Sequence, residues 1–271
     1  MVQSPPIVLT IAGFDPSAGA GITADIKTIA AHGGYGVACI TALTVQSTLG
    51  VRRVQPVELG ILAESLSEMA RDMTFAAVHV GMLASAETAN VVADFLSQNR
   101  PKNIVLDPVI NATSGAVLLD APGLRVLIER LIPVAAVITP NLHEASIISG
   151  LAVTTRQDMP SAAAKLHQMG AKAVIITGGH FDQPCDLLSC TGNHGVNQQF
   201  FEARRINSTS THGTGCAFST AIACQLAKGR SLADAVDRAQ AYVSRAIEEA
   251  YPVGKGVGPL NHLYGRREME P

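Results

Sequence analysis

Ile104-Val-Leu-Asp107-Pro108 is the first of three similar stretches that decide the fold of this chain. The other two are Ala136-Val-Ile-Thr139-Pro-Asn141 and Ala173-Val-Ile-Ile-Thr177-Gly-Gly179. Each stretch is a continuous apolar run that ends in polar residues, a pattern typical of parallel strands that are buried on both faces. Helical patterns lie between the runs, as the crossover connections of a parallel sheet require. The sequence therefore predicts an α/β fold built on a mostly parallel sheet.

The polar residues that end these three runs predict where a ligand binds. In a parallel sheet the carboxyl ends of the strands lie at one edge, and ligands bind in the crevice beyond them. We therefore expect Asp107, Asn141 and Thr177 to converge on one site.

The remaining elements extend this pattern toward both ends of the chain. Apolar β-branched runs predict strands, and apolar residues at helical spacing predict helices. The expected strands span residues 7–12, 37–45, 51–57, 77–80, 187–190 and 198–201, and the expected helices span 22–32, 58–72, 86–99, 216–228 and 231–250. Because no linker or repeat interrupts the pattern, we expect a single domain over residues 1–271, with an irregular tail after Tyr251.

A glycine-rich loop, Ser210-Thr-His-Gly-Thr-Gly-Cys216, leads into one of the predicted helices. Glycines at 213 and 215 allow a tight turn, and the unpaired amides and positive dipole end of a helix N-terminus favour an anion such as phosphate. The same field would stabilise a thiolate at Cys216, which would then be a base beside a phosphate. The alternative is a turn that caps a core helix and carries a small buried cysteine. The loop taken alone does not separate the two.

Composition indicates the kind of partner and compartment. The chain has 271 residues, of which 47% are apolar and 15% charged, and its net charge of −2 provides no basic field for nucleic acid or anionic lipid. The apolar run Ile7–Ala12 is too short for a signal-peptide core or a membrane span. Five cysteines without paired spacing favour a reducing compartment. We expect a cytoplasmic protein with small-molecule partners.

Six motifs occur in an order that identifies a family. They are Ala12-Gly-Phe-Asp-Pro-Ser-Ala-Gly-Ala-Gly-Ile-Thr-Ala-Asp-Ile-Lys-Thr28, Gly81-Met-Leu83, Leu106-Asp-Pro-Val109 with Ala112-Thr-Ser-Gly115, Thr139-Pro-Asn-Leu-His-Glu144, Gly178-Gly-His180 and Thr211-His-Gly-Thr-Gly-Cys216. Together they closely resemble the hydroxymethylpyrimidine/phosphomethylpyrimidine kinases, the thiamin-pathway members of the ribokinase superfamily. The resemblance implies a ribokinase-like fold: a central, mostly parallel sheet with helices on both faces and a small strand lid.

The resemblance also implies an activity. Kinases of this family use ATP and Mg²⁺ to phosphorylate the hydroxymethyl group of 4-amino-5-hydroxymethyl-2-methylpyrimidine, and then convert the monophosphate to the diphosphate. A homodimer is implied as well.

The implied pyrimidine site takes its residues from several of the motifs. On this resemblance, the pyrimidine is surrounded by Gly13, Asp25, Gln46, Met82 and Val109. These residue types suit a neutral aminopyrimidine, because an amide can hydrogen-bond to ring nitrogens and to an exocyclic amine. Apolar side chains can contact the ring and its methyl group.

The implied phosphate-transfer site centres on the glycine loop. Cys216 takes the position of the general base, and the backbone of Gly213, Thr214, Gly215 and Cys216 stabilises the transferring phosphoryl group. The family pattern places Asn141, Thr177 and Gly179 at the nucleotide and assigns Asp107 and Glu144 to Mg²⁺. Carboxylates suit this hard cation.

The chain departs from the family pattern at four positions. Thr177, His79 and Gln240 stand where many members have lysine, and His143 stands where many have proline. Threonine at 177 brings no positive charge to the nucleotide phosphates. His79 follows an apolar strand, so we expect a packed or hydrogen-bonded histidine rather than a catalyst.

Two other functions remain open at the level of sequence. Pyridoxal, pyridoxine and pyridoxamine also carry a hydroxymethyl group on a ring of similar size, so a kinase of vitamin B6 salvage is one alternative. The missing lysines also fit a pyrimidine-binding sensor with weak kinase activity, although the complete glycine loop favours an enzyme.

Overall fold

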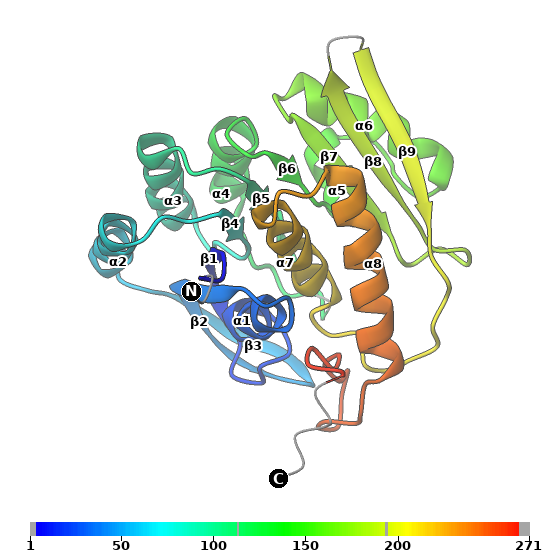
Figure 1. Ribbon diagram of the computed structural model, residues 1–271, viewed down its shortest axis with the longest axis horizontal. Helices are drawn as coiled ribbons and strands as arrows, with labels where there is room; N and C mark the ends of the chain where they lie inside the picture. The colour runs from blue at the N-terminus through cyan, green and yellow to red at the C-terminus, as the bar shows by residue number, and fades with distance from the viewer. Residues whose placement is uncertain (1–3, 113, 193–194, 266–271) are drawn as a thin grey trace.

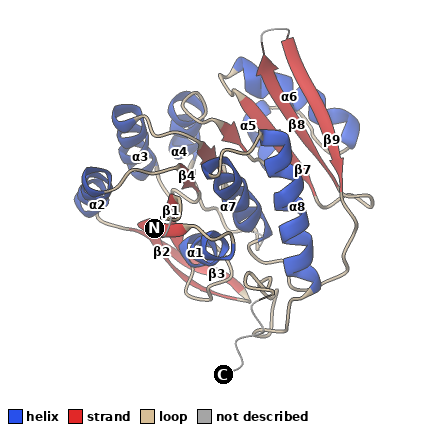
Figure 2. Ribbon diagram, in the orientation of Figure 1, coloured by secondary structure: helices blue, strands red, loops and turns tan. Residues whose placement is uncertain are grey.

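One sheet of nine strands organises the part of the chain that the structure describes. The structure is a computed structural model and describes residues 4–112, 114–192 and 195–265. The strand order is β3-β2-β1-β4-β5-β6-β7-β8-β9 (Figures 1 and 2). The strands are β1 Ile7–Phe14, β2 Tyr35–Ser47, β3 Gly50–Pro56, β4 Ala77–Val80, β5 Ile104–Leu106, β6 Val137–Ile138, β7 Ala173–Gly178, β8 Cys185–Gly192 and β9 Gly195–Glu202.

The middle of the sheet is parallel and its edges are antiparallel. Strands β2, β1, β4, β5, β6 and β7 pair in parallel, whereas β3 pairs antiparallel with β2 and the β8–β9 hairpin antiparallel with β7. The predicted parallel sheet is therefore confirmed. The strand expected at 136–139 is shorter and spans Val137–Ile138. Thr139 lies just beyond its end, and its N–H bonds to Leu106 O.

Helices cover both faces of the sheet, as the resemblance implied. They are α1 Gly21–Ala31, α2 Leu59–Asp72, α3 Ala86–Asn99, α4 Ala121–Val126, α5 Leu142–Ser149, α6 Met159–Gln168, α7 Thr214–Ala227 and α8 Leu232–Glu248. Helices α2 to α6 pack in one apolar cluster with strand residues such as Leu9, and α1, α7 and α8 pack in another with the opposite-facing Val8. This alternation along apolar strands is what a sheet buried on both faces requires.

Capping residues fix where two of these helices begin. Asn141 Oδ1 accepts from the Glu144 amide and Glu144 Oε2 accepts from the Asn141 amide, which is a capping box at the start of α5. The Ser231 side chain caps α8 by accepting from the Asp234 amide, as the sequence predicted. The capping box places Asn141 and Glu144 directly beyond β6.

The predicted irregular tail joins two distant parts of the chain. Residues 251–265 contain no helix or named strand, and 266–271 lie outside the described residues. Val257 N–H bonds to Thr48 O at the tip of the β2–β3 hairpin, and Gly258 N–H bonds to Thr209 O beside the glycine loop. The tail therefore connects the hairpin, which corresponds to the predicted strand lid, with that loop. None of the described helices is long and apolar enough to cross a membrane.

Candidate active site

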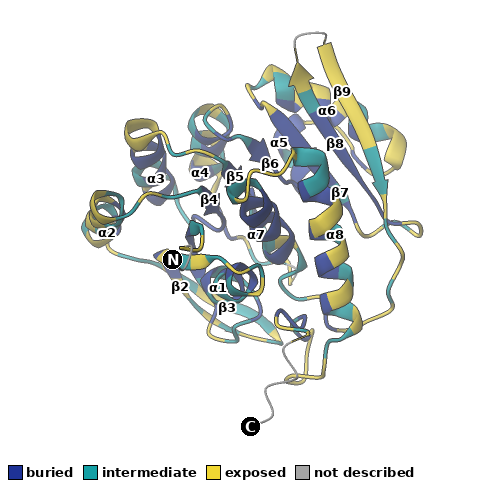
Figure 3. Cartoon of the chain, viewed as in Figure 1, coloured by how far each residue is buried: buried dark blue, intermediate teal, exposed yellow. Residues whose placement is uncertain are grey.

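Helix α7 runs through the middle of the molecule (Figure 1). Helix α7 packs against β1, β4 and β5 and between α1 and α8, and residues 217–225 are all buried (Figure 3). Its N-cap, Gly213, has φ +82°, so the chain enters the helix at Thr214 and not, as expected, at Cys216. The helical ladder starts with Ala217 N–H bonding to Gly213 O. The amides of Gly215 and Cys216 precede that ladder and are available to an anion.

The loop after β1 lies directly against this glycine loop. An added Cβ at Gly213 would overlap the carbonyl oxygen of Gly19, and one at Gly19 would overlap the His212 ring. Asp15 joins the two loops, because its carboxylate accepts from Ala20 N–H at 2.9 Å and lies 2.9 Å from His212 Nε2. Two motifs far apart in the sequence therefore form one surface.

Gly213→Ala should destabilise the protein. Alanine at this position would have to adopt a left-handed conformation while its Cβ overlaps Gly19. We expect a loss of about 2–5 kcal/mol in the free energy of unfolding, measured by chemical denaturation. Gly215→Ala is the matched control, since a Cβ there meets no atom within 4 Å. Equal stability of the two variants would contradict this account of the loop contact.

Two buried carboxyl groups lie close to the start of α7. Burial and the proximity of Asp107 raise the pKa of Glu144, and burial and the charge of Asp25 raise that of Asp107, although His79 opposes this shift. Asp107 follows β5, and Glu144 lies in the first turn of α5. Two neighbouring carboxylates whose pKa values are raised by burial are a donor set that fits a hard divalent cation.

The ends of β6 and β7 meet as the sequence predicted. Asn141 and Thr177 form a parallel bridge, and Thr177 N–H bonds to Pro140 O. Gly179 follows β7, is exposed, and has open space where a Cβ would lie. Asp107 follows β5, the strand next to β6, so the ends of β5, β6 and β7 lie along one edge of the sheet.

The electrostatic surroundings of Cys216 differ from the positive field that a helix N-terminus alone would provide. The half-buried thiol lies within hydrogen-bonding reach of the Asp107 carboxylate and of the Gly21 amide. Burial and the charges of Asp107, Asp25 and Glu144 raise the pKa of Cys216 well above its ordinary value. Burial and these carboxylates therefore oppose the stabilisation that the helix N-terminus would give a thiolate, and the role of Cys216 as a base stays a prediction.

Four of the five predicted pyrimidine residues gather near the end of β1. An added Cβ at Gly13 would overlap the Met82 side chain, and Val109 packs in the small apolar cluster that contains Met82. The lid residues Val51 and Val54 belong to the same cluster. Gln46 projects from β2, and its neighbour Thr44 donates to Phe14 O, next to Gly13.

Asp25 lies apart from these four residues in the core, and its contact with a pyrimidine stays a prediction. Asp25 is fully buried. One carboxylate oxygen accepts from Thr220 Oγ1 at 2.8 Å, while the other accepts from Thr10 Oγ1 at 2.6 Å and lies 3.2 Å from His79 Nδ1. With its oxygens turned into the core, Asp25 has no accessible atom to offer a ligand.

His79 links this buried carboxylate to the active-site edge. The histidine is fully buried, with Nε2 2.9 Å from Ser219 Oγ, and that hydroxyl lies 3.3 Å from Asp107 Oδ2. Burial alone would lower the pKa of His79, but Asp25 and Asp107 raise it overall. The prediction of a packed, hydrogen-bonded histidine is confirmed. Its chain to Asp107 could not be predicted, because Ser219 is one small residue within an apolar helix.

Two other departures from the family pattern also have local partners. Gln240 Nε2 donates to Asp186 Oδ2 at 2.7 Å, and burial raises the pKa of Asp186 to about 6. His143 Nε2 lies 3.2 Å from Asn111 Nδ2 in the loop after β5. Neither Asp186 nor Asn111 was identified from sequence, since nothing in their local pattern marks them.

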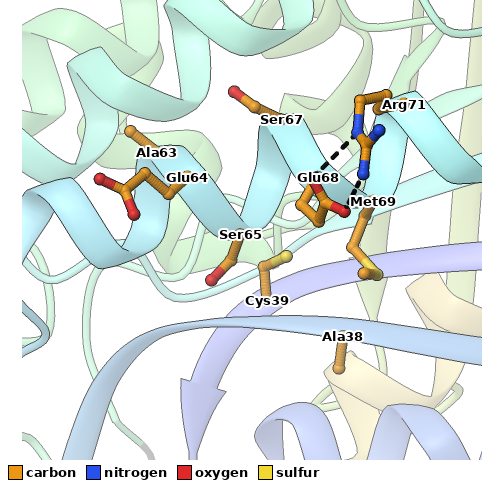
Figure 4. A pocket seen from close by; sticks show the side chains of 9 residues that line it. All are labelled: Ala38, Cys39, Ala63, Glu64, Ser65, Ser67, Glu68, Met69 and Arg71. Carbon is orange, nitrogen blue, oxygen red and sulfur yellow. Dashed lines mark hydrogen bonds and ion pairs between the residues drawn. The ribbon is translucent and has the colours of Figure 1, made fainter.

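A groove lies away from these residues, between β2 and α2. It encloses about 800 Å³ and is lined by residues that include Cys39, Glu64 and Met69 (Figure 4). Its one arginine, Arg71, is paired with Glu68 on the same helix. The groove therefore offers no unpaired cation for a phosphate, and we do not assign the chemistry to it.

The parallel sheet, the anion-binding start of a buried helix and the carboxylates at the strand ends define a phosphotransferase with the ribokinase-like fold. Residues 15–261 match the family described as phosphomethylpyrimidine kinase. The chain belongs to this family.

Individual relatives agree with that assignment. The hydroxymethylpyrimidine/phosphomethylpyrimidine kinase of Haemophilus influenzae is 41% identical over 94% of this chain and 96% of its own length. The thiamine biosynthesis bifunctional protein ThiED of Geobacter sulfurreducens is 41% identical over 97% of this chain, which spans 53% of that protein. Among solved structures, the ADP complex of Bacillus subtilis pyridoxal kinase has a TM-score of 0.86 and 33% identity, covering 96% of this chain and 98% of that chain.

Proposed function

We propose that this protein phosphorylates 4-amino-5-hydroxymethyl-2-methylpyrimidine and then its monophosphate, with ATP as the donor, in thiamin biosynthesis. The observation that carries the proposal is the position of Cys216 and the α7 amides against the loop that follows Gly13. Family membership over residues 15–261 supports the substrate class.

The apolar cluster around Met82 supplies the proposed pyrimidine pocket. The Met82 side chain packs directly against Gly13, where any added Cβ would overlap it, and Val109 packs in the same cluster. These residues would contact the flat ring and its methyl group, while Gln46 would hydrogen-bond to the ring edge. The substrate hydroxymethyl group would then point toward the N-terminus of α7.

In the proposed chemistry the substrate hydroxyl oxygen bonds to the γ-phosphorus of ATP while the bond from that phosphorus to ADP breaks, and ADP leaves. Cys216, as the thiolate that forms once Mg²⁺ and ATP are bound, accepts the proton of that hydroxyl, and the amides of the segment from Gly213 through Thr214 and Gly215 stabilise the negative charge on the transferring group. Asn141, Thr177 and Gly179 hold the nucleotide phosphates at the strand ends.

Asp107 and Glu144 would hold Mg²⁺. The ion would supply positive charge to the phosphates and offset the carboxylates that keep Cys216 protonated in the protein without ligands. Both carboxyl groups are buried, and their raised pKa values suit this role.

Mass spectrometry of products tests the function. The purified protein is incubated with Mg·ATP and, separately, with hydroxymethylpyrimidine, its monophosphate and pyridoxal. We expect mono- and diphosphates of the pyrimidine. Phosphorylation of pyridoxal alone would instead indicate vitamin B6 salvage, an alternative favoured by the similarity to B. subtilis pyridoxal kinase. Binding of the pyrimidine without any product would indicate a sensor.

We further propose a homodimer that forms through the outer face of the β2–β3 hairpin. Leu43 and Val45 of β2 are 49% and 55% exposed, and Ile61 of α2 is 62% exposed. Exposed apolar side chains that gather on one surface favour association. Val45→Glu should shift the mass measured by light scattering from dimer to monomer. Glu64→Gln, which removes an exposed charge, should leave the measured mass unchanged. A monomeric wild-type protein would contradict the proposal.

The remaining expectations are also proposals. A single kinase domain is supported by the one sheet that runs from β1 to β9. A cytoplasmic location is supported by five cysteines that are all free in the structure, as a reducing compartment would keep them.

A further inference from the structure

Gln46, His212 and Asp15 form a hydrogen-bonded cluster where the lid meets the two loops. His212 Nε2 lies 2.9 Å from Asp15 Oδ2 and 3.1 Å from Gln46 Nε2. Gln46 Oε1 lies 3.2 Å from Thr44 Oγ1. The cluster thus joins the loop after β1, the glycine loop and the lid.

The hydrogen on His212 Nε2 is fixed by Asp15. Besides His212, the Asp15 carboxylate accepts from Ser17 N–H at 2.8 Å, Ser17 Oγ at 2.7 Å and Ala20 N–H at 2.9 Å. Burial would raise the pKa of Asp15, but the hydrogen bonds from His212 and Ser17 lower it overall, so the group is a carboxylate that accepts at both oxygens. His212 Nε2 must therefore carry the hydrogen and donate it.

This hydrogen decides which way the Gln46 amide faces. Two N–H groups cannot hydrogen-bond to each other, and the nitrogen and oxygen of an amide are assigned from their partners. Turning the Gln46 amide by half a turn lets Oε1 share the single His212 Nε2 hydrogen with Asp15 Oδ2 in a three-centre bond, and lets Nε2 donate to Thr44 Oγ1. The Thr44 hydroxyl donates in turn to Phe14 O at 3.0 Å, so every donor in the chain has an acceptor.

In this arrangement one N–H of Gln46 is not used by the protein. Nε2 carries two hydrogens, and Thr44 takes one of them. Gln46 is half-buried on the same face of β2 as Thr44, toward the loop after β1. The remaining N–H is available to a hydrogen-bond acceptor on a bound ligand.

We infer that His212 is a positioning residue that orients Gln46 as a hydrogen-bond donor, so that the site selects neutral heteroaromatic rings with an acceptor nitrogen. The inference rests on the proposed function and narrows its substrate class. Aminopyrimidines have such nitrogens when neutral, whereas a protonated pyridine ring presents an N–H, which the Gln46 donor would reject. If the Gln46 amide had the opposite orientation, its oxygen would accept from the N–H of a protonated ring and favour that ring.

The surroundings of His212 keep the orientation fixed before a ligand arrives. The His212 amide bonds to Gly258 O in the tail at 3.0 Å. Its ring lies against Gly19, where a Cβ would overlap it, and Pro259 packs at the same position. A donor that is already in place does not have to be ordered when the ligand binds.

Calorimetric binding and steady-state kinetics of three single variants test the inference. His212→Phe keeps a ring against Gly19 but loses the N–H, and we expect Kd and KM for hydroxymethylpyrimidine to rise about tenfold with kcat within about twofold of wild type. His212→Gln restores a side-chain N–H and should recover part of the affinity. Gln46→Glu replaces the donor with an acceptor and should weaken binding by about a hundredfold or more.

A double variant separates positioning from general damage. If His212 acts through Gln46, adding His212→Phe to Gln46→Ala should change Kd by less than about twofold, because coupled residues are not additive. Full additivity, or unchanged pyrimidine affinity in both His212 variants, would overturn the inference while the wild-type activity stood. If the wild-type protein itself did not bind the pyrimidine, the proposed function would fail and this inference with it.

Discussion

Cys216→Ala is expected to lower kcat for pyrimidine phosphorylation by about 10²–10⁴-fold, the range that positioned proton transfer contributes. The thiol lies at the first turn of α7, within reach of the Asp107 carboxylate and the Gly21 amide. In the proposed chemistry Cys216 accepts the substrate proton, while the neighbouring Asp107 carboxylate holds Mg²⁺. Removing the sulfur should therefore slow the chemical step and leave binding of pyrimidine and ATP close to that of the wild type.

Cys190→Ala and Cys216→Ser are the controls for this variant. Cys190 lies on β8 and is half-buried, so Cys190→Ala should leave kcat unchanged and exclude a general effect of losing a thiol. Cys216→Ser places a hydroxyl of similar size there, but a hydroxyl is a far weaker acid than a thiol and does not supply an anionic base near neutral pH, so its kcat should stay near that of the alanine variant. Turnover of Cys216→Ala within tenfold of wild type would remove Cys216 from the proton transfer.

The same site shows what the sequence could predict. The ends of the apolar runs at Asp107, Asn141 and Thr177 marked the catalytic edge, because topology alone brings the ends of neighbouring parallel strands together. Glycine at 213 marked a tight turn, and the structure shows a left-handed N-cap there. These predictions needed only backbone pattern and residue type.

Side-chain partnerships across the fold could not be predicted in the same way. The family resemblance implied the pyrimidine contact of Asp25, whereas the bond that its carboxylate on α1 accepts from Thr220 on α7 joins residues 195 positions apart. Likewise, the dipole argument for Cys216 was local, and the carboxylates that raise its pKa come from other elements. His212 was visible within the glycine motif, yet its partners Asp15 and Gln46 lie far away in the sequence.

His79→Leu is expected to destabilise the fold by about 3–5 kcal/mol, because removing one member of a buried charged pair leaves the other unpaired. His79 and Asp25 are both fully buried, with Nδ1 and Oδ2 3.2 Å apart. Chemical denaturation measures the loss. His143→Leu, at an exposed histidine, should change stability by less than about 0.5 kcal/mol.

A second substitution and the pH dependence of stability identify the cause of the destabilisation by His79→Leu. Asp25→Asn removes the unpaired charge, so the double variant should be more stable than His79→Leu alone, and His79→Lys should keep a buried cation beside Asp25. Since the pKa of His79 is raised from 6.5, its pairing contributes stability that is complete below pH 6.5 and is lost as pH rises through the raised pKa. His79→Leu should lack this contribution to the pH dependence. A double variant no more stable than His79→Leu would assign the loss to packing instead of charge, and the chain from Asp25 through His79 and Ser219 to Asp107 would then have no electrostatic role in holding the catalytic edge.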